Sequence, residues 1–230
     1  MKHYAIEIKE LDETIEGIKN GSNIMIISPP MSGKEAVLDN IMYHRATKNE
    51  TALIIVTTNE PAFHILERFK KKELELSLSR IGMVDCISKN FDEVDFENAI
   101  IKTVNSPADL TSIGVRIGQF IDDFSKKGLK IQIHINSLST ILMYSNNQTV
   151  FRFLHNLTGR IKAAEALGIF VIGSGMHDKQ TIATLKQFCD CLVEIKSENN
   201  INFIRIIGQF AKSTPWFEYE FNDMCSIISN

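Results

Sequence analysis

Hydrophobic residues gather in short apolar runs that alternate with longer amphipathic stretches along the chain. Most of the short runs are apolar at consecutive positions, as in strands that are buried on both faces of a sheet. Such runs lie at 23–27, 51–57, 81–87, 130–137 and 169–172, and the fourth alternates strictly. Strands separated by helical stretches predict crossover units, and therefore a mainly parallel α/β sheet flanked by helices.

The amphipathic stretches carry apolar residues at helical spacing and predict helices between these strands. The helix near 113–124 follows the start signature Ser106-Pro107-x-Asp109 and stops at Gly128. The other predicted helices lie at 34–47, 61–72, 150–164 and 178–188. Two late strands, at 191–196 and 202–207, flank a turn and predict a C-terminal antiparallel hairpin. Without a linker or a composition break, the pattern predicts one domain over 1–230.

Charge and cysteine content narrow the classes of function. The chain of 230 residues carries 25 Lys and Arg against 28 Asp and Glu, a formal net charge of -3, which argues against nucleic acid as a partner. No apolar run approaches the roughly 18 residues of a membrane span, and the start of the chain turns acidic early, so we expect a cytoplasmic protein with no membrane partner. The four cysteines match no zinc spacing and are interpreted as buried thiols.

One loop carries candidate chemistry. The segment Ser28-Pro29-Pro30-Met31-Ser32-Gly33-Lys34-Glu35 follows a strong strand and opens a helix, where the phosphate loop G-x-x-x-x-G-K-[ST] belongs. Such a loop surrounds a phosphate with backbone N–H groups, a lysine and a magnesium-binding hydroxyl. Gly33 and Lys34 are present, whereas Ser28 replaces the first glycine and Glu35 replaces the hydroxyl residue.

Glu35 is the serious departure from this pattern. A carboxylate about 4 Å from a phosphate repels it by about 4 kcal/mol at an effective dielectric constant near 20. Binding then requires that Mg²⁺ bridge the two groups or that Glu35 rotate away. The alternative is a turn that has lost its function, in which Lys34 is a solvated or ion-paired surface lysine.

Several segments together resemble the KaiC-like branch of the RecA-type ATPases. The loop resembles G-P-P-G-S-G-K, and other similar segments are Glu10-Leu11-Asp12, Gly21-Ser22, Val56-Thr57-Thr58-Asn59-Glu60-Pro61, Ile133-His134-Ile135-Asn136-Ser137-Leu138-Ser139 and Gly175-Met176-His177-Asp178. The resemblance covers most of the chain from Glu10 to about Ile195. It implies a RecA-like fold with nucleotide at the carboxyl ends of the strands, often between neighbouring subunits.

The departures from the family pattern concern metal binding and water activation. The Walker B aspartate, which organises the magnesium shell, is Asn136, and an amide lacks the charge that holds a hard cation. The expected carboxylate pair is Asn59-Glu60, so only Glu60 remains as a candidate catalytic base. Its alternative role is a carboxylate at the start of a helix. Ser28, Ser32, Gly33, Lys34, Glu35 and Asn136 form a candidate degenerate site for ATP or ADP, with weak or no Mg²⁺ dependence and no metal site.

Some polar and aromatic residues have both a structural and a functional interpretation. Gln132 and His134 share a strand face with Asn136, and we expect His134 to be a hydrogen-bonded core residue rather than a catalyst. Arg68 and the lysines at 70–72 are expected at a solvated helix end. Trp216 and Tyr219 either pack a last edge strand or face a partner subunit.

Three functions follow from these residues. The first is a degenerate RecA-like domain that does not hydrolyse ATP, or does so very slowly, and acts as a regulatory or protein-interaction module, for example in signal transduction. The second is an atypical ATPase in which Glu35 or Glu60 takes over metal binding or water activation. The third is a structural subunit of a mixed RecA-like assembly. The expected partner is therefore a protein, which includes self-association.

Overall fold

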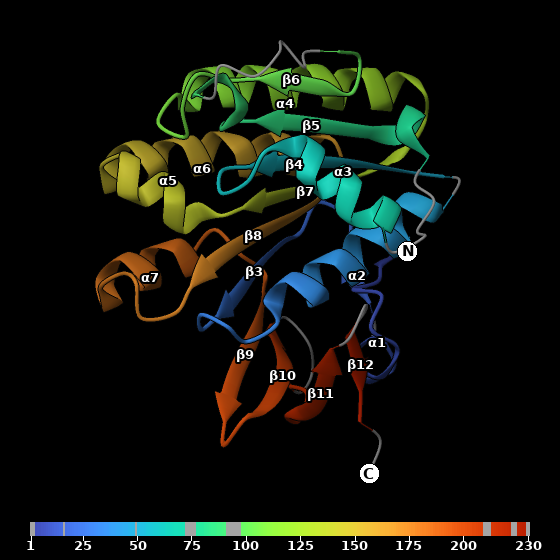
Figure 1. The fold of residues 1–230 in the computed structure, drawn as a ribbon, viewed down its shortest axis with the longest axis vertical. Helices are drawn as coiled ribbons and strands as arrows, with labels where there is room; N and C mark the ends of the chain where they lie inside the picture. Colours follow the sequence, from blue (N-terminus) through green and yellow to red (C-terminus); the bar gives the residue numbers. More distant parts are fainter. Residues whose placement is uncertain are drawn as a thin grey trace.

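The computed structural model describes residues 3–15, 17–48, 50–71, 77–90, 98–208, 213–221 and 225–228. These residues form a ten-stranded sheet with helices on both faces (Figure 1). A separate antiparallel ribbon joins β1 (His3–Tyr4) to β2 (Ile18–Lys19), and helix α1 (Lys9–Thr14) lies between them in sequence.

Seven strands make the parallel part of the sheet, in the order β9-β3-β8-β7-β4-β5-β6. Each crossover that includes a helix returns the chain to the same edge, so the carboxyl ends of these strands lie together. Their bounds are β3 (Asn23–Ser28), β4 (Thr51–Thr57), β5 (Ile81–Asp85), β6 (Ile101–Thr103), β7 (Lys130–Asn136), β8 (Leu167–Gly173) and β9 (Cys191–Glu198). The predicted mainly parallel α/β sheet is confirmed.

Two sets of helices cover the two faces of this sheet. Helices α2 (Lys34–Thr47) and α3 (Ala62–Lys71) lie on one face, and α4 (Leu110–Lys126) and α6 (Asn147–Ala163) lie on the other (Figure 1). The second face also receives α5 (Leu138–Tyr144) and α7 (Lys179–Lys186). Side chains cap the starts of α4, α5, α6 and α7, because each accepts a backbone N–H three residues ahead: Asp109, Ser137, Asn146 and Asp178.

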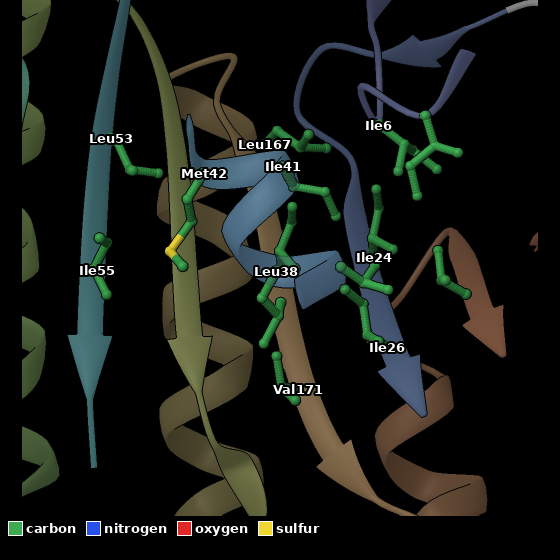
Figure 2. Packing of buried hydrophobic residues seen from close by; sticks show 14 of the residues in the cluster. Ile6, Ile24, Ile26, Leu38, Ile41, Met42, Leu53, Ile55, Leu167 and Val171 are labelled. Atoms are coloured by element: carbon green, nitrogen blue, oxygen red, sulfur yellow. The ribbon is translucent and has the colours of Figure 1, made fainter. Parts of the chain in front are cut away.

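Alternation along the strands divides the apolar core into two layers. All seven residues of β4 are buried; Leu53 and Ile55 pack under α2, whereas Ile54 and Val56 pack under α4 and α6. Figure 2 shows the α2 layer, in which Met42 projects from the helix toward the strands. A strand buried on both faces reads as a continuous apolar run, which is why these strands were visible in the sequence.

The C-terminal part extends the sheet with antiparallel strands. β10 (Ile201–Gly208) pairs with β9 and with β11 (Phe217–Phe221), and β11 pairs with β12 (Cys225–Ile227). The predicted hairpin is confirmed, but β11 is not the edge strand, because β12 covers it. Tyr219 is buried, and Trp216 stacks with the cations of Lys196 and Arg205 at 4.7 and 4.4 Å.

The predicted element ends need small corrections. The strand predicted at 81–87 stops at Asp85, since the Asp85 carboxylate accepts the N–H groups of Ile87 and Ser88 and turns the chain into the short 3₁₀ helix Ser88–Asn90. A second 3₁₀ helix, Leu78–Arg80, precedes β5. The helix predicted at 61–72 spans Ala62–Lys71, and Lys72 lies outside the described residues. The elements that were not predicted are β1, α1, β2, β6, α5 and β12. The single domain over 1–230 stays a prediction.

Candidate functional site

The strand order brings the phosphate loop and the end of β7 to one edge of the sheet. β8 lies between β3 and β7, and Ser28 at the end of β3 is level with Gly173 of β8. Two strand spacings separate β3 from β7, and Asn136 lies two residues short of the level of Ser28. Ser28 and Asn136 are therefore about 12 Å apart across this edge. Open parallel sheets bind ligands at this edge.

The loop after β3 is held closed by two hydrogen bonds. The Ser32 hydroxyl donates to the carbonyl oxygen of Pro29 at 2.9 Å, across the loop. The Tyr219 hydroxyl from β11 donates to the carbonyl oxygen of Ser32 at 2.5 Å. Ser28 and Ser32 are both buried, and the Ser28 hydroxyl has no partner among the described residues. The loop is thus tied to itself and to the C-terminal strands.

The loop leaves its backbone N–H groups available to an anion. Gly33 caps α2 at φ 71°, a left-handed conformation that glycine adopts without strain. Met31, almost fully exposed at the tip, has φ 56° despite its side chain. Within the described residues, no hydrogen bond uses the backbone N–H groups at 31–35. Together with the start of α2, these groups suit a phosphate.

Lys34 is paired with the residue that follows it. Its ammonium group contacts the Glu35 carboxylate at 2.5 Å. The Lys34 side chain is 21% exposed and that of Glu35 is 59% exposed. Of the two alternatives for a loop without nucleotide, the structure therefore has the ion-paired lysine and not the solvated one. A pair this exposed contributes only about 0–1 kcal/mol, so a competing anion can open it.

The residues at the end of β7 offer amides and hydroxyls rather than carboxylates. The Asn136 carbonyl accepts the N–H of Thr58, and the Asn136 Oδ1 is buried with no partner among the described residues. The Asn59 side chain is hydrogen-bonded to Ser137 and Thr140. Among the described residues no three His, Cys, Asp or Glu side chains are grouped to hold a metal ion. The residues present fit a phosphate group but not a tightly held magnesium ion.

Glu60 is held in an ion-pair cluster. Arg68 of α3 donates to both Glu60 oxygens at 2.8 and 3.2 Å and to both Asp39 oxygens at 3.0 and 3.2 Å. Burial alone would lower the pKa of Arg68, but the hydrogen bonds to Glu60 and the charge of Asp39 raise it instead. The expected solvated helix end at Arg68 is wrong, because two acidic partners hold its guanidinium. The catalytic role of Glu60 stays a prediction.

His134 is buried as expected, whereas its expected hydrogen bonds stay a prediction. Both of its ring nitrogens lack a partner among the described residues, and so do both polar atoms of Gln132. Burial, with a smaller contribution from the charge of Arg45, lowers the pKa of His134 to about 3. The ring is therefore neutral at physiological pH.

Other predicted residues have structural roles. Asp178 caps α7 through the N–H of Thr181 at 2.8 Å, and the adjacent His177 is only partly exposed. All four cysteines are free; Cys86 and Cys191 are buried, as predicted, while Cys189 and Cys225 are only partly buried. None of the helices in the described part of the chain has the length and hydropathy of a membrane span.

Two contacts that shape the site were not predicted. Tyr219 lies 187 residues from Ser32, so no local pattern links them. Met176, in the loop after β8, packs so closely over Gly173 that a Cβ there would collide with its thioether. The only sequence signals were the aromatic cluster near the C-terminus and the glycine itself.

Comparison with known proteins supports the fold and assigns a family. The chain is similar to the KaiC-like protein PH0186 from the hyperthermophilic archaeon Pyrococcus horikoshii OT3, with 15% identity, a TM-score of 0.73 and 99% of each chain covered. It is also similar to the uncharacterized protein PH0321 from Pyrococcus horikoshii in complex with an unknown peptide, with 18% identity, a TM-score of 0.71, and 97% of this chain and 98% of that chain covered.

These likenesses show a KaiC-like RecA fold, as the resemblance in the sequence predicted. No curated protein matches the sequence. The sequence profile of one family, described as a family of unknown function (DUF7504), matches residues 21–195. The match includes both the phosphate loop and the end of β7, so the chain belongs to the DUF7504 family.

Proposed function

We propose that this chain is a degenerate phosphate-loop domain that binds ATP or ADP weakly and with little dependence on Mg²⁺. It hydrolyses the nucleotide very slowly or not at all, and it acts as a regulatory or protein-interaction module. The observation that carries this proposal is the Lys34–Glu35 ion pair inside an otherwise well-formed loop. An incoming phosphate must displace Glu35 from Lys34, which lowers affinity without closing the site.

The polar groups across the edge support the weak metal dependence. Phosphoryl transfer relies on a metal ion to neutralise charge and on a residue to position the attacking water. Asn136 offers an amide where a carboxylate would hold the ion, and Asn59 is occupied by Ser137 and Thr140. The atypical-ATPase alternative needs Glu35 or Glu60 to take over metal binding or water activation. Glu60 would have to leave Arg68, and its two hydrogen bonds with the guanidinium count against that role. Glu35 would have to leave Lys34.

Two considerations support a protein partner. One structural neighbour, PH0321, is described as being in complex with an unknown peptide, so a chain of this fold can present a peptide-binding surface. The phosphate loop is also tied to the C-terminal strands through Tyr219, so a partner that engages those strands could sense the state of the loop. The partner in this proposal includes a second copy of the chain. A structural subunit of a mixed RecA-like assembly stays an alternative function.

The double variant Glu35→Thr, Asn136→Asp tests the proposal. It restores a hydroxyl and a carboxylate at the two substituted positions. In calorimetric titration with ATP, the affinity of the double variant should depend on Mg²⁺. The affinity of the wild type should be weak and should not depend on Mg²⁺. Glu13→Thr, the same chemical change at an exposed position of α1, is the control and should behave like the wild type. Tight, Mg²⁺-dependent binding by the wild type would overturn the proposal.

A further inference from the structure

One face of β7 carries a row of polar side chains under helix α2. Gln132, His134 and Asn136 occupy alternate positions of the strand, so all three point to the same side of the sheet. Met42 of α2 projects toward the strands on this side (Figure 2). The residues level with Gln132 and His134 on the neighbouring strands are aliphatic: Leu53, Ile55, Leu167 and Ile169.

The members of this row are buried without hydrogen-bond partners. Gln132 is 0% exposed and His134 is 1% exposed. Both amide atoms of Gln132, both ring nitrogens of His134 and the Oδ1 of Asn136 lack a partner among the described residues. Buried polar atoms are almost always hydrogen-bonded to protein or to ordered water. So many unpartnered atoms in consecutive same-face positions call for a common explanation.

A direct contact between the side chains cannot supply all the missing partners. A neutral histidine has one donor and one acceptor nitrogen on opposite sides of the ring. A hydrogen bond to Gln132 would satisfy one of them and leave the other. Same-face residues of a strand lie about 6.5–7 Å apart. That is comparable to the span of about 5.6 Å that one water molecule bridges with two hydrogen bonds.

We propose that Gln132, His134 and Asn136 bind a short file of ordered water molecules between β7 and α2. Each water would use two or more of the orphaned polar atoms, the number that a buried water typically requires. The Nε of Arg45, on α2, is also buried and unpartnered and could bind a further water. At the other end the file reaches Asn136, at the same sheet edge as the phosphate loop. The inference concerns internal hydration and does not depend on nucleotide binding.

A high-resolution crystal structure of the wild-type protein tests the inference directly. We expect ordered water within hydrogen-bond distance of His134 and Gln132. The opposite face of β7, formed by Ile131, Ile133 and Ile135, is the internal control and should be dry. A tightly packed, water-free row, or new side-chain contacts that satisfy every atom, would overturn the proposal.

Stability measurements on Leu variants provide a second test. Each single change, Gln132→Leu or His134→Leu, should lower the midpoint of thermal unfolding, because the remaining polar side chain and the buried water lose a hydrogen-bond partner. The double variant should lose the water and recover part of that midpoint. A dry row predicts the reverse, namely that each single change raises the midpoint by removing a buried polar group. If the double variant fails to fold, the two single variants and the wild-type crystal structure still show whether the row contains water.

Discussion

The two faces of the central sheet are built differently. The face under α4 and α6 is packed with aliphatic and aromatic side chains, among them Ile133, Leu154 and Phe170. The face under α2 contains a comparable apolar layer, but buried polar and charged groups interrupt it. These groups are Ser28, Asp39, Arg45, Gln132 and His134, and they lead toward the phosphate loop.

The two faces differ in how many buried polar groups they contain. Burying polar groups is unfavourable unless each finds a partner, so a purely structural layer avoids them. Departures from this rule are expected at functional sites. The α2 helix begins in the phosphate loop, and most of the buried polar groups of the strands lie on its face of the sheet. Asn23 of β3, close to Ile161 of α6, is an exception on the other face. The buried polar groups of the α2 face therefore lie on the same side of the sheet as the helix that opens in the phosphate loop.

The largest loss of stability should come from a change in the face under α4 and α6. Leu154 is fully buried on α6, and Leu154→Ala should lower the free energy of unfolding by about 2–5 kcal/mol through lost burial and a residual cavity. Urea denaturation measures this loss. Val115→Ala, at an exposed position of α4, is the control and should change stability by no more than about 0.5 kcal/mol. Equal effects at the two positions would contradict the packing described for this face.

On the α2 face, Arg68→Met should reduce stability by about 2–3 kcal/mol. The change leaves the Asp39 carboxylate, 2% exposed, without the guanidinium that neutralises it. Lys70→Met, at an exposed site of the same helix, is the matched control. Adding Asp39→Asn to Arg68→Met should restore part of the loss. If denaturation shows no recovery in the double variant, the buried carboxylate is not the cause.

The buried His134 on the α2 face should make the free energy of unfolding depend on pH. Its folded-state pKa of about 3 lies below the unfolded value of about 6.5, so the unfolded chain binds the proton first. Stability is therefore complete above about pH 6.5 and falls as the pH drops below it, by about 2 kcal/mol at pH 5. Unfolding curves of the wild type and of His134→Leu, recorded above pH 6.5 and at pH 5, measure this loss of stability. His155→Leu, at an exposed position of α6, is the control and should retain the wild-type dependence of unfolding free energy on pH. If His134→Leu also retains this dependence, His134 is not its cause.

The smallest effect should follow from Tyr219→Phe. This change removes the hydrogen bond to the Ser32 carbonyl and keeps the ring, at a cost of about 1 kcal/mol. Amide hydrogen exchange should become faster at Ala36 and Val37, whose N–H groups donate to the Gly33 carbonyl, whereas the N–H groups of β4 should be unaffected. Uniform acceleration across the sheet would mean that the tyrosine supports the whole fold and not the loop in particular.

The sequence predicted the doubly buried strands better than the short elements. Strands β3, β4 and β8 were visible because doubly buried strands are apolar at nearly every position. The three-residue strand β6 and the seven-residue helix α5 were missed, since elements this short show no clear period.

The candidate site was predicted in its order but not in its contacts. Lys34 and Glu35 are adjacent, so their pairing could be foreseen as one alternative. Asp39 and Glu60 meet on Arg68 only because α2 and α3 pack on the same face. The tie from Tyr219 to Ser32 depends on the antiparallel extension, which places the far end of the chain beside the loop. Tertiary contacts of this kind leave no periodic signal.

In the proposed function, the loop retains a phosphate cradle but holds no Mg²⁺ tightly. Calorimetric titration of the wild-type protein with ATP, once in excess Mg²⁺ and once in a chelator, tests this most directly. We expect the same weak affinity in both conditions and no steady release of phosphate. Binding that becomes tight only with Mg²⁺, accompanied by continuous phosphate release, would contradict it.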